Sequence, residues 1–454
     1  MLSIKKILLQ IENNVESIIK EDNILGKDLW LILQQQHPAD IALIINNIEH
    51  EFQINLFKKL PKELAIKVFE KIQEPVQADI LSHLDQDDIE WIITQIPVNA
   101  LTELFEHISD QDLEKYLKLL QVKQRNALIS LRSFPPESAG ARMQSDVLTL
   151  QENFTVKRSI EVLQRLTPKQ TLTRRIYITD KNNVVVGYLD LDKLVLNKPE
   201  TPLAQIMEKS ELLVTVDEDQ EDVANQMRHY NLDSAPVIDR EKHFLGIITV
   251  EDVFEIIEEE ESEDVYKMSG QAPMEYSYFA TPTWTLVKQR IPWLIGLLLL
   301  QSFSSMILAS YDDMISRYTI ITLFLTMLIG TGGNVGNQSA TLVIRGLTTK
   351  EITRQNGMKM LLREVSIALI IAGIVVTFGF ARVYHASHDL VSTIAISLSL
   401  FLIIVTSVAL GTLIPLTLER FNLDPAHSAA PFLTTLMDIL GVIIYCFVCS
   451  KILG

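Results

Sequence analysis

The chain has 454 residues, of which 48% are hydrophobic and 21% are charged. This composition is too charged for a protein that lies wholly in a membrane, and its C-terminal half is too apolar for a soluble one. The formal net charge is −17, and the residues from 285 onward hold eleven Lys or Arg and eight Asp or Glu, so the first 284 residues carry −20. Such an acidic half repels nucleic acid and anionic lipid, and we expect metal ions rather than phosphate polymers as its ligands.

The first twenty residues mix acidic with apolar side chains and lack an uninterrupted apolar segment before a cleavage site. They predict no secretory signal, so we expect the N-terminal half to stay in the cytoplasm. Between about 38 and 131, segments such as "LPKELAIKVFEKI" and "SDQDLEKYLKLL" recur at roughly twelve-residue spacing. Each begins with a helix start signal, which predicts a solenoid-like stack of short helices in an N-domain of residues 1–135.

After "FPPESAGARM" the pattern changes to alternating strands and helices. The segment "RRIYITDKNNVVVGYLDLDKL" reads as strand, turn, strand and helix start, and "SAPVIDREKHFLGIITVEDVFEII" repeats that order about sixty residues later. This repeat resembles paired CBS modules, here at 136–200 and 201–260, which commonly act as regulatory ligand sensors. An acidic linker or plug helix is expected at 261–287, which begins within the stretch "EEEESEDVYKMSG" at 258–270.

Apolar segments then predict five membrane spans at about 291–311, 318–344, 365–381, 390–418 and 426–450. The loop between the second and third spans is rich in basic residues, whereas the turns at 312–317 and 382–389 hold one Arg each. Basic loops stay on the cytoplasmic side, so we expect a cytoplasmic N-terminus, five crossings and a C-terminus outside the cell.

Asp438 lies about ten residues inside the last predicted span. An ionised Asp at mid-bilayer costs about 2.5–3.5 kcal/mol, so it is expected to face a wet pathway or a partner. A protonated, purely structural Asp is the alternative. Cys446 and Cys449 in the same span have no second Cys pair, and we interpret them as small packing residues.

The stretch "GTGGNVGNQSATLVIRG" is too polar and flexible for an ordinary span. It lacks the third Gly of a dinucleotide loop and the Gly-Lys-Ser/Thr of a P-loop, which excludes those phosphate sites. Glycines would let the span bend or unwind so that carbonyl oxygens face a cavity, with close helix packing as the alternative. The candidate pore-lining residues are Gly332, Gly333, Asn334, Gly336 and Asn337.

Together with "DPAHSAAPFLTTLMDILGVIIY" and the domain order, this stretch resembles the MgtE family of magnesium transporters and channels. The resemblance covers essentially the whole chain. It implies a homodimer with the ion pathway between subunits, Asp438 as the pore acid for hydrated Mg²⁺, and closure when cytosolic Mg²⁺ is high. It also implies the cytosolic Mg²⁺ ligands Asp219, Glu221, Asp252, Glu255, Glu260, Glu263 and Asp424.

Helical spacing brings Asp252, Glu255 and Glu259 close enough to repel one another unless a cation intervenes, although a solvated acidic helix gives the same pattern. Two departures from the family weaken some of these sites: Asn231 replaces an acid, and the acidic turn is "PVNA" at 97–100, with only Glu103 just beyond. His385 and His388 have no third His nearby to complete a metal site. A nucleotide at the CBS pair is a further candidate ligand.

The sequence therefore predicts a multidomain α + α/β membrane protein with a solenoid-like N-domain, a CBS pair, a plug helix and a transmembrane domain at 288–454. The predicted function is a Mg²⁺ channel or transporter of the cell inner membrane, closed by cytosolic Mg²⁺ and not an enzyme. The alternatives are a CBS-regulated carrier of Co²⁺ or Mn²⁺, and a sensor with a non-conducting membrane anchor.

Overall fold

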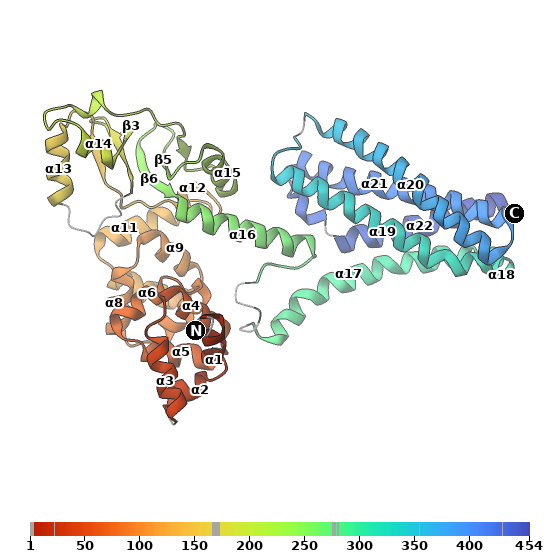
Figure 1. Ribbon diagram of the computed structural model, residues 1–454, viewed down its shortest axis with the longest axis horizontal. Coiled ribbons are helices and arrows are strands. Elements are labelled where there is room, and N and C mark those ends of the chain that lie inside the picture. The colour runs from red at the N-terminus through yellow and green to blue at the C-terminus, as the bar shows by residue number, and fades with distance from the viewer. Residues whose placement is uncertain are drawn as a thin grey trace. The chain divides into compact units, whose positions relative to one another are not determined.

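The computed structural model describes residues 4–21, 23–165, 173–274, 278, 281–353, 355–428 and 430–454 (Figure 1). The chain divides into two compact units. The N-terminal unit comprises Met1–Glu260 and Met274–Thr281, and the C-terminal unit comprises Glu261–Pro273 and Pro282–Gly454.

Short helices form the first part of the N-terminal unit, and from α4 to α11 each begins twelve residues after the one before it. The predicted stack of short helices is therefore confirmed. The bounds are α1 Ile4–Glu12, α2 Val15–Lys20, α3 Ile24–Leu33, α4 Pro38–Asn47, α5 His50–Lys59, α6 Lys62–Phe69, α7 Glu74–Ser82, α8 Gln86–Gln95, α9 Val98–Glu106, α10 Asp110–Leu119 and α11 Val122–Leu131.

The helices α1–α11, called the N-domain below, share one apolar core. Many of them pack on the next helix but one, as α4 does on α6, α5 on α7 and α7 on α9, which is the arrangement of a solenoid. Ile45, Leu56 and Phe69 are fully or almost fully buried between them. Local start signals fix the helix ends, because Pro38 opens α4 and the Ser109 hydroxyl accepts the Asp112 N–H at the start of α10.

The second part of the N-terminal unit contains two three-stranded sheets of the same topology, which confirms the tandem repeat. In each sheet the first two strands are parallel and the last two are antiparallel. The bounds are α12 Ala139–Arg142, β1 Thr149–Gln151, α13 Val156–Arg165, β2 Arg175–Thr179, β3 Val185–Asp190, α14 Leu191–Leu196, η1 Leu203–Gln205, β4 Val214–Thr215, α15 Gln220–Tyr230, β5 Ser234–Ile238, β6 Phe244–Thr249 and α16 Val250–Met268.

The two sheets meet through a small apolar cluster of Tyr177, Tyr188, Phe244 and Ile247. The Tyr177 hydroxyl also donates a hydrogen bond of 2.9 Å to the Ser234 carbonyl oxygen of the other module. This contact joins the repeats into one pair. The helix α16 that follows the second sheet runs without interruption across residues 260 and 261, where the sequence suggested that a separate linker begins.

Five helices of the C-terminal unit are long and apolar enough to cross a membrane, as the sequence predicted. Most of them are longer than the expected spans because polar residues at their ends continue the helix. The bounds are α17 Thr283–Ser310, α18 Asp312–Arg317, α19 Thr319–Thr348, α20 Gly357–Ser387, α21 Leu390–Arg420, η2 Pro425–Ser428 and α22 Ala430–Leu453.

Within this unit α21 packs extensively against α19, α20 and α22, whereas α17 packs on α22. Two tyrosines tie α22 to the beginning of α19: the Tyr445 hydroxyl donates to the Ile321 carbonyl at 2.9 Å, and the Tyr318 hydroxyl donates to the Leu453 carbonyl at 2.8 Å. Cys446 and Cys449 are free and buried in α22, consistent with a packing role.

Candidate cation sites

Asp438 lies in α22, eight residues after its first residue, Ala430, which corresponds to about 12 Å along the helix axis. Its side chain is half-buried, and Gln301 of α17 is its hydrogen-bonding neighbour. A carboxylate with one neutral amide partner keeps most of its acceptor capacity free. It can therefore bind a cation or the water of a hydrated ion.

Polar side chains of α19 meet α22 one turn before Asp438. The Asn337 amide nitrogen donates a hydrogen bond of 2.9 Å to the Thr434 hydroxyl, and a side chain at Gly333 would touch the Thr434 methyl group. The Asn337 carbonyl oxygen is buried and has no hydrogen-bond partner within the described ranges. Because an unsatisfied buried acceptor costs about 1–3 kcal/mol, this oxygen is a second candidate contact for a hydrated ion.

A polar stripe runs along the exposed face of α19: Asn334, Gln338, Thr341 and Arg345 follow one another at three- and four-residue intervals and are all exposed on the single chain. The helical repeat places them on one face. Asn334 and Gln338 lie in the middle of a candidate membrane span, where amides exposed to lipid are costly. This face therefore requires water or another protein surface.

The expectation that glycines unwind the second span is wrong, because α19 is one continuous α-helix from Thr319 to Thr348. Gly332 and Gly336 are buried against α21, where the Ser407 hydroxyl donates a hydrogen bond to the Gly332 carbonyl. Gly411 of α21 lies directly against the backbone of Gly336. The Gly-x₃-Gly pattern of α19 therefore faces a Ser-x₃-Gly pattern in α21. These small residues let the two helices pack so closely that their backbones are in contact.

These contacts separate the five candidate pore residues into different surroundings. Gly332 and Gly336 pack against α21 and Gly333 lies against Thr434 of α22, whereas Asn334 is exposed and Asn337 is half-buried. The structure does not bring all five together on one surface. Only the two asparagines present polar side chains.

Glu364 is a buried acid that the sequence reasoning missed. The sequence predicts that the third span begins at about 365, but α20 begins at Gly357, so Glu364 lies inside the helix with 5% of its surface exposed. The Ser339 hydroxyl of α19 donates a hydrogen bond of 2.9 Å to its carboxylate. The helix start signal at Asn356 and Gly357 was the available clue to its position.

Two of the expected cytosolic Mg²⁺ ligands cap helices. Asp252 accepts hydrogen bonds of 2.7 Å from both the backbone N–H and the hydroxyl of Thr249 at the start of α16, and Asp219 accepts the Glu221 N–H at the start of α15. Burial raises the pKa of Asp252, although the bonds from Thr249 lower it in part. Asn231 occupies the left-handed cap position after α15 (φ 54°), where Asn is a favoured residue.

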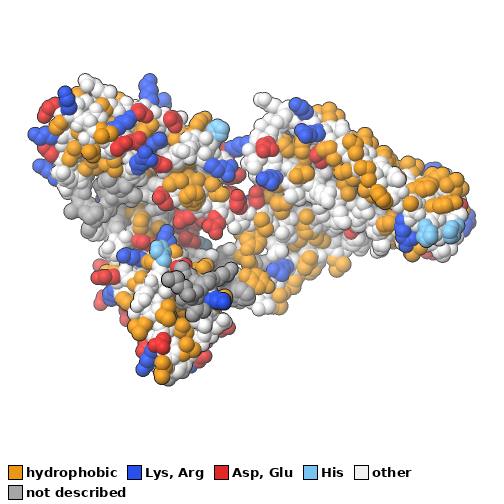
Figure 2. Space-filling model, in the orientation of Figure 1, with side chains coloured by type: hydrophobic (Ala, Val, Ile, Leu, Met, Phe, Trp, Pro, Cys, Tyr) orange, Lys and Arg blue, Asp and Glu red, His pale blue; other side chains and the backbone are white. Residues whose placement is uncertain are grey.

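Further acids of α16 gather with acids of the N-domain. Burial raises the pKa of Glu255, and the negative charges of Asp252 and of Glu74 in α7 raise it further. Burial likewise raises the pKa of Glu259, with added repulsion from Glu74 and Glu106. Figure 2 shows acidic side chains gathered over α16. This acidic surface, formed by α7, α9 and α16, attracts cations.

The four remaining expected ligands have side-chain partners. The Glu221 carboxylate accepts a hydrogen bond of 3.5 Å from the Asn225 amide. Glu260 accepts a hydrogen bond of 2.6 Å from the Gln220 amide. Glu263 and Asp424 both pair with the Lys267 ammonium group, at 2.8 and 2.7 Å. Burial lowers the pKa of Lys267, but the two carboxylates more than offset it and the net shift is upward.

The "PVNA" turn forms the cap and first turn of α9, and Glu103 one turn further on pairs with Arg142.

His385 and His388 lie with ring centroids 6.3 Å apart. Among the described residues, close metal-ligand spacing is found instead for Asp239, Glu241 and His243 in the turn between β5 and β6. That turn is on the surface, and its Asp239 carboxylate already accepts hydrogen bonds from the other two residues.

Three family models match the chain. The model for the MgtE divalent cation transporter matches residues 325–448, the model for the MgtE intracellular N domain matches 36–137, and the CBS domain model matches 203–259. The chain is 29% identical to the magnesium transporter MgtE of Thermus thermophilus over 426 residues, which are 93% of this chain and 94% of that protein. It is also 29% identical to the magnesium transporter MgtE of Enterococcus faecalis over 449 residues, 90% of this chain and 96% of that protein.

Among solved structures, the cytosolic domain of the Mg²⁺ channel MgtE in complex with ATP matches 54% of this chain and 99% of its own, with 25% identity and a TM-score of 0.49. The soluble part of a magnesium transporter matches 57% of this chain and 99% of its own, with 23% identity and a TM-score of 0.47.

Proposed function

The chain belongs to the MgtE family of divalent cation transporters, and we propose that it conducts Mg²⁺ across the cytoplasmic membrane along a pathway that includes Asp438. Membership of the family makes it a multi-pass membrane transporter and not an enzyme. The observation that carries the proposed pathway is the half-buried carboxylate of Asp438 inside a membrane helix, with the neutral amide of Gln301 as its hydrogen-bonding neighbour.

The ligand chemistry supports Mg²⁺ as the ion. Mg²⁺ dehydrates reluctantly, keeps several waters and is commonly held by one or two carboxylates. One Asp438 from each of two subunits would supply two, and the amides of Asn334 and Asn337 would hydrogen-bond the water shell. A second copy of the chain covering the polar stripe of α19 would also remove its exposure to lipid, so we propose a homodimer with the pathway between subunits.

Uptake into proteoliposomes tests this function. Purified wild-type protein should admit Mg²⁺, and Asp438→Asn should abolish uptake because the neutral amide attracts the cation far less. Asp313→Asn, which changes an exposed acid of α18, is the matched control and should keep wild-type uptake. Retained uptake in Asp438→Asn would exclude the proposed pore acid, and equal uptake of Co²⁺ or Mn²⁺ would favour the broader carrier.

Regulation by cytosolic Mg²⁺ follows from the acidic surface. Carboxylates are suitable Mg²⁺ ligands, and acids on separate helices that repel one another when the ion is scarce can be bridged when it is abundant. We propose that Mg²⁺ bound among Glu255 and the other acids of the family's set favours the closed state. The midpoint of closure would then depend on the difference in Mg²⁺ affinity between the two states.

The test of regulation is Mg²⁺ uptake or open probability measured while Mg²⁺ on the N-terminal side is varied. Flux that falls as this Mg²⁺ rises supports the proposal, and flux independent of it refutes it. Nucleotide binding at the CBS pair stays a prediction, which the same measurement checks when ATP is added. The orientation with a cytoplasmic N-terminus and an external C-terminus is proposed from the basic residues between 345 and 364, where α19 ends and α20 begins.

A further inference from the structure

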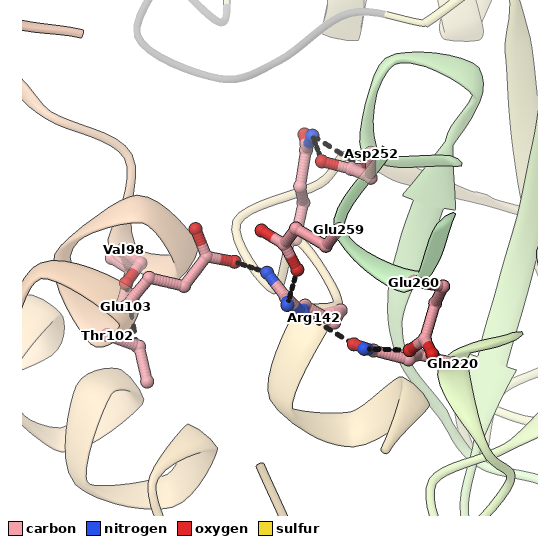
Figure 3. A network of polar contacts seen from close by, with 9 residues as sticks. Val98, Thr102, Glu103, Arg142, Gln220, Asp252, Glu259 and Glu260 are labelled. Carbon is pink, nitrogen blue, oxygen red and sulfur yellow. Dashed lines mark hydrogen bonds and ion pairs between the residues drawn. The ribbon is translucent and has the colours of Figure 1, made fainter. Parts of the chain in front are cut away.

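We infer that Arg142 is a built-in cation that holds the N-domain on the second CBS module without Mg²⁺. Arg142 ends the short helix α12, and its guanidinium lies among side chains of three other helices, α9, α15 and α16 (Figure 3). The inference concerns how the acidic surface is regulated and rests on the proposed function for its consequence in transport. The contact itself lies within the N-terminal unit.

Each nitrogen of the guanidinium has its own partner. One terminal nitrogen donates a hydrogen bond of 2.8 Å to Glu103 of α9, and the other donates to Glu259 of α16. Nε donates a hydrogen bond of 2.7 Å to the Gln220 carbonyl oxygen of α15, and the Gln220 amide donates onward to Glu260. The planar fork of arginine can satisfy three partners in fixed directions, which a lysine ammonium cannot reproduce.

Burial distinguishes this contact from an ordinary surface ion pair. The Arg142 side chain is 16% exposed and that of Glu103 is 25% exposed. Removing one partner of a largely buried pair leaves an uncompensated charge, whereas exposed pairs contribute little. We therefore expect Arg142 to matter for the arrangement of the N-domain.

The surroundings show what the guanidinium neutralises. The carboxylates of Glu74 and Glu259 repel that of Glu103. The carboxylates of Glu74 and Glu106 likewise repel that of Glu259. Without a cation at this point, the N-domain helices α7 and α9 would present these acids to the acids of α16 and repel them. Arg142 takes the place that a bridging divalent ion would otherwise have to fill.

The two kinds of cation differ in one respect that can be measured. An ion bridge forms only when the ion is abundant, whereas an arginine is charged at every physiological pH and is always present at its site. In this chain the N-domain should therefore stay docked when Mg²⁺ is removed. Mg²⁺-dependent gating would then arise from acids that Arg142 does not contact, such as Glu255 and those of the second half of α16.

The experiment measures docking as a distance within the full-length protein. Spin labels at cysteines replacing Gln111 of α10 and Lys209, which precedes β4, report the separation of the N-domain and the CBS pair, because both positions are exposed. Distance distributions are recorded by double electron–electron resonance in EDTA and in millimolar Mg²⁺. The distance is read without any flux, so a failure of the proposed transport function would leave the result standing.

The wild-type protein should show the same short distance in both solutions. Arg142→Gln should lose the short-distance population in EDTA and regain it with Mg²⁺, and Arg142→Lys should lose part of it. Arg132→Gln is the matched control, since Arg132 is an exposed residue at the end of α11. If Arg142→Gln fails to fold, Glu259→Ala, at a half-exposed position, should shift the EDTA distribution toward longer distances.

The inference is overturned if the wild-type distance lengthens in EDTA as much as that of Arg142→Gln, or if Arg142→Gln and Glu259→Ala both keep the short distance. A variant that stays open in Mg²⁺ would show that a divalent ion cannot replace the guanidinium, which also overturns it.

Discussion

Replacing Gly411 with Ala tests the backbone contact between α19 and α21. A Cβ atom at Gly411 would lie 3.3 Å from the Gly336 Cα and well inside contact distance of the Gly336 carbonyl oxygen. Both atoms belong to the backbone of a long helix, so no side-chain rotation can relieve the overlap and the helices must move apart. Overpacking of this kind costs about 1–3 kcal/mol.

The magnitude can be isolated with a second glycine. Gly373 of α20 has no atom within 4 Å of an added Cβ, so Gly373→Ala changes only helix propensity, by about 0.5–1 kcal/mol in favour of folding. The same propensity gain accompanies Gly411→Ala. The difference in unfolding free energy between the two variants therefore measures the cost of the overlap alone. We expect this difference to be about 1–3 kcal/mol.

Thermal unfolding of the purified protein in detergent measures this difference. For a unit of this size, each kcal/mol lowers the melting temperature by about 2–4 °C. Gly336→Ala, whose Cβ would meet the Ser407 hydroxyl, should also destabilise the protein, because the displaced hydroxyl loses its bond to the Gly332 carbonyl. If Gly411→Ala melts at the same temperature as Gly373→Ala, the helices are not in backbone contact and the reasoning is refuted.

Burial raises the pKa of Glu103 from 4.5 to about 7 although Arg142 opposes this shift, so docking favours the protonated acid and should weaken as the pH rises from about 4.5 to about 7. Glu103→Gln should flatten this pH profile, measured with the same spin labels; an unchanged profile would count against it. Asp252→Ala should lower unfolding stability by about 1 kcal/mol in EDTA through loss of the α16 cap, and no loss in EDTA would contradict the capping role. At the left-handed cap position, Asn231→Ala should lower the melting temperature and Asn231→Gly should preserve it; equal melting of the two would exclude the backbone explanation.

The sequence predicts the fold well where local signals repeat. Eight helix starts at twelve-residue intervals, from Pro38 to Val122, follow from start signals within each segment. The five spans follow from length and composition. Neither feature depends on a distant residue, so a single sequence is enough.

The conformation of the glycine-rich span could not be predicted in the same way. Its glycines are compatible with an unwound helix and with close packing, and the choice is made by Ser407, 75 residues from Gly332, and by Gly411. Arg142 was missed for the same reason, because its partners Glu103 and Glu259 come from other helices. Thr249 and Asp252 have the spacing of a capping box, which the hydrogen bonds confirm, whereas Mg²⁺ binding by Asp252 stays a prediction.

Lys267 would make metal binding at Glu263 and Asp424 an exchange of one cation for another, because its ammonium group already pairs with both carboxylates. Any divalent ion that takes both carboxylates must displace this ammonium, so the site gains one positive charge rather than two when the lysine moves away into water. Asp424 lies just before η2 and α22, the helix that carries Asp438. A divalent ion from solution would thus compete with the Lys267 ammonium group for these two carboxylates. The ammonium group is held near them by its own side chain, whose length sets its effective concentration.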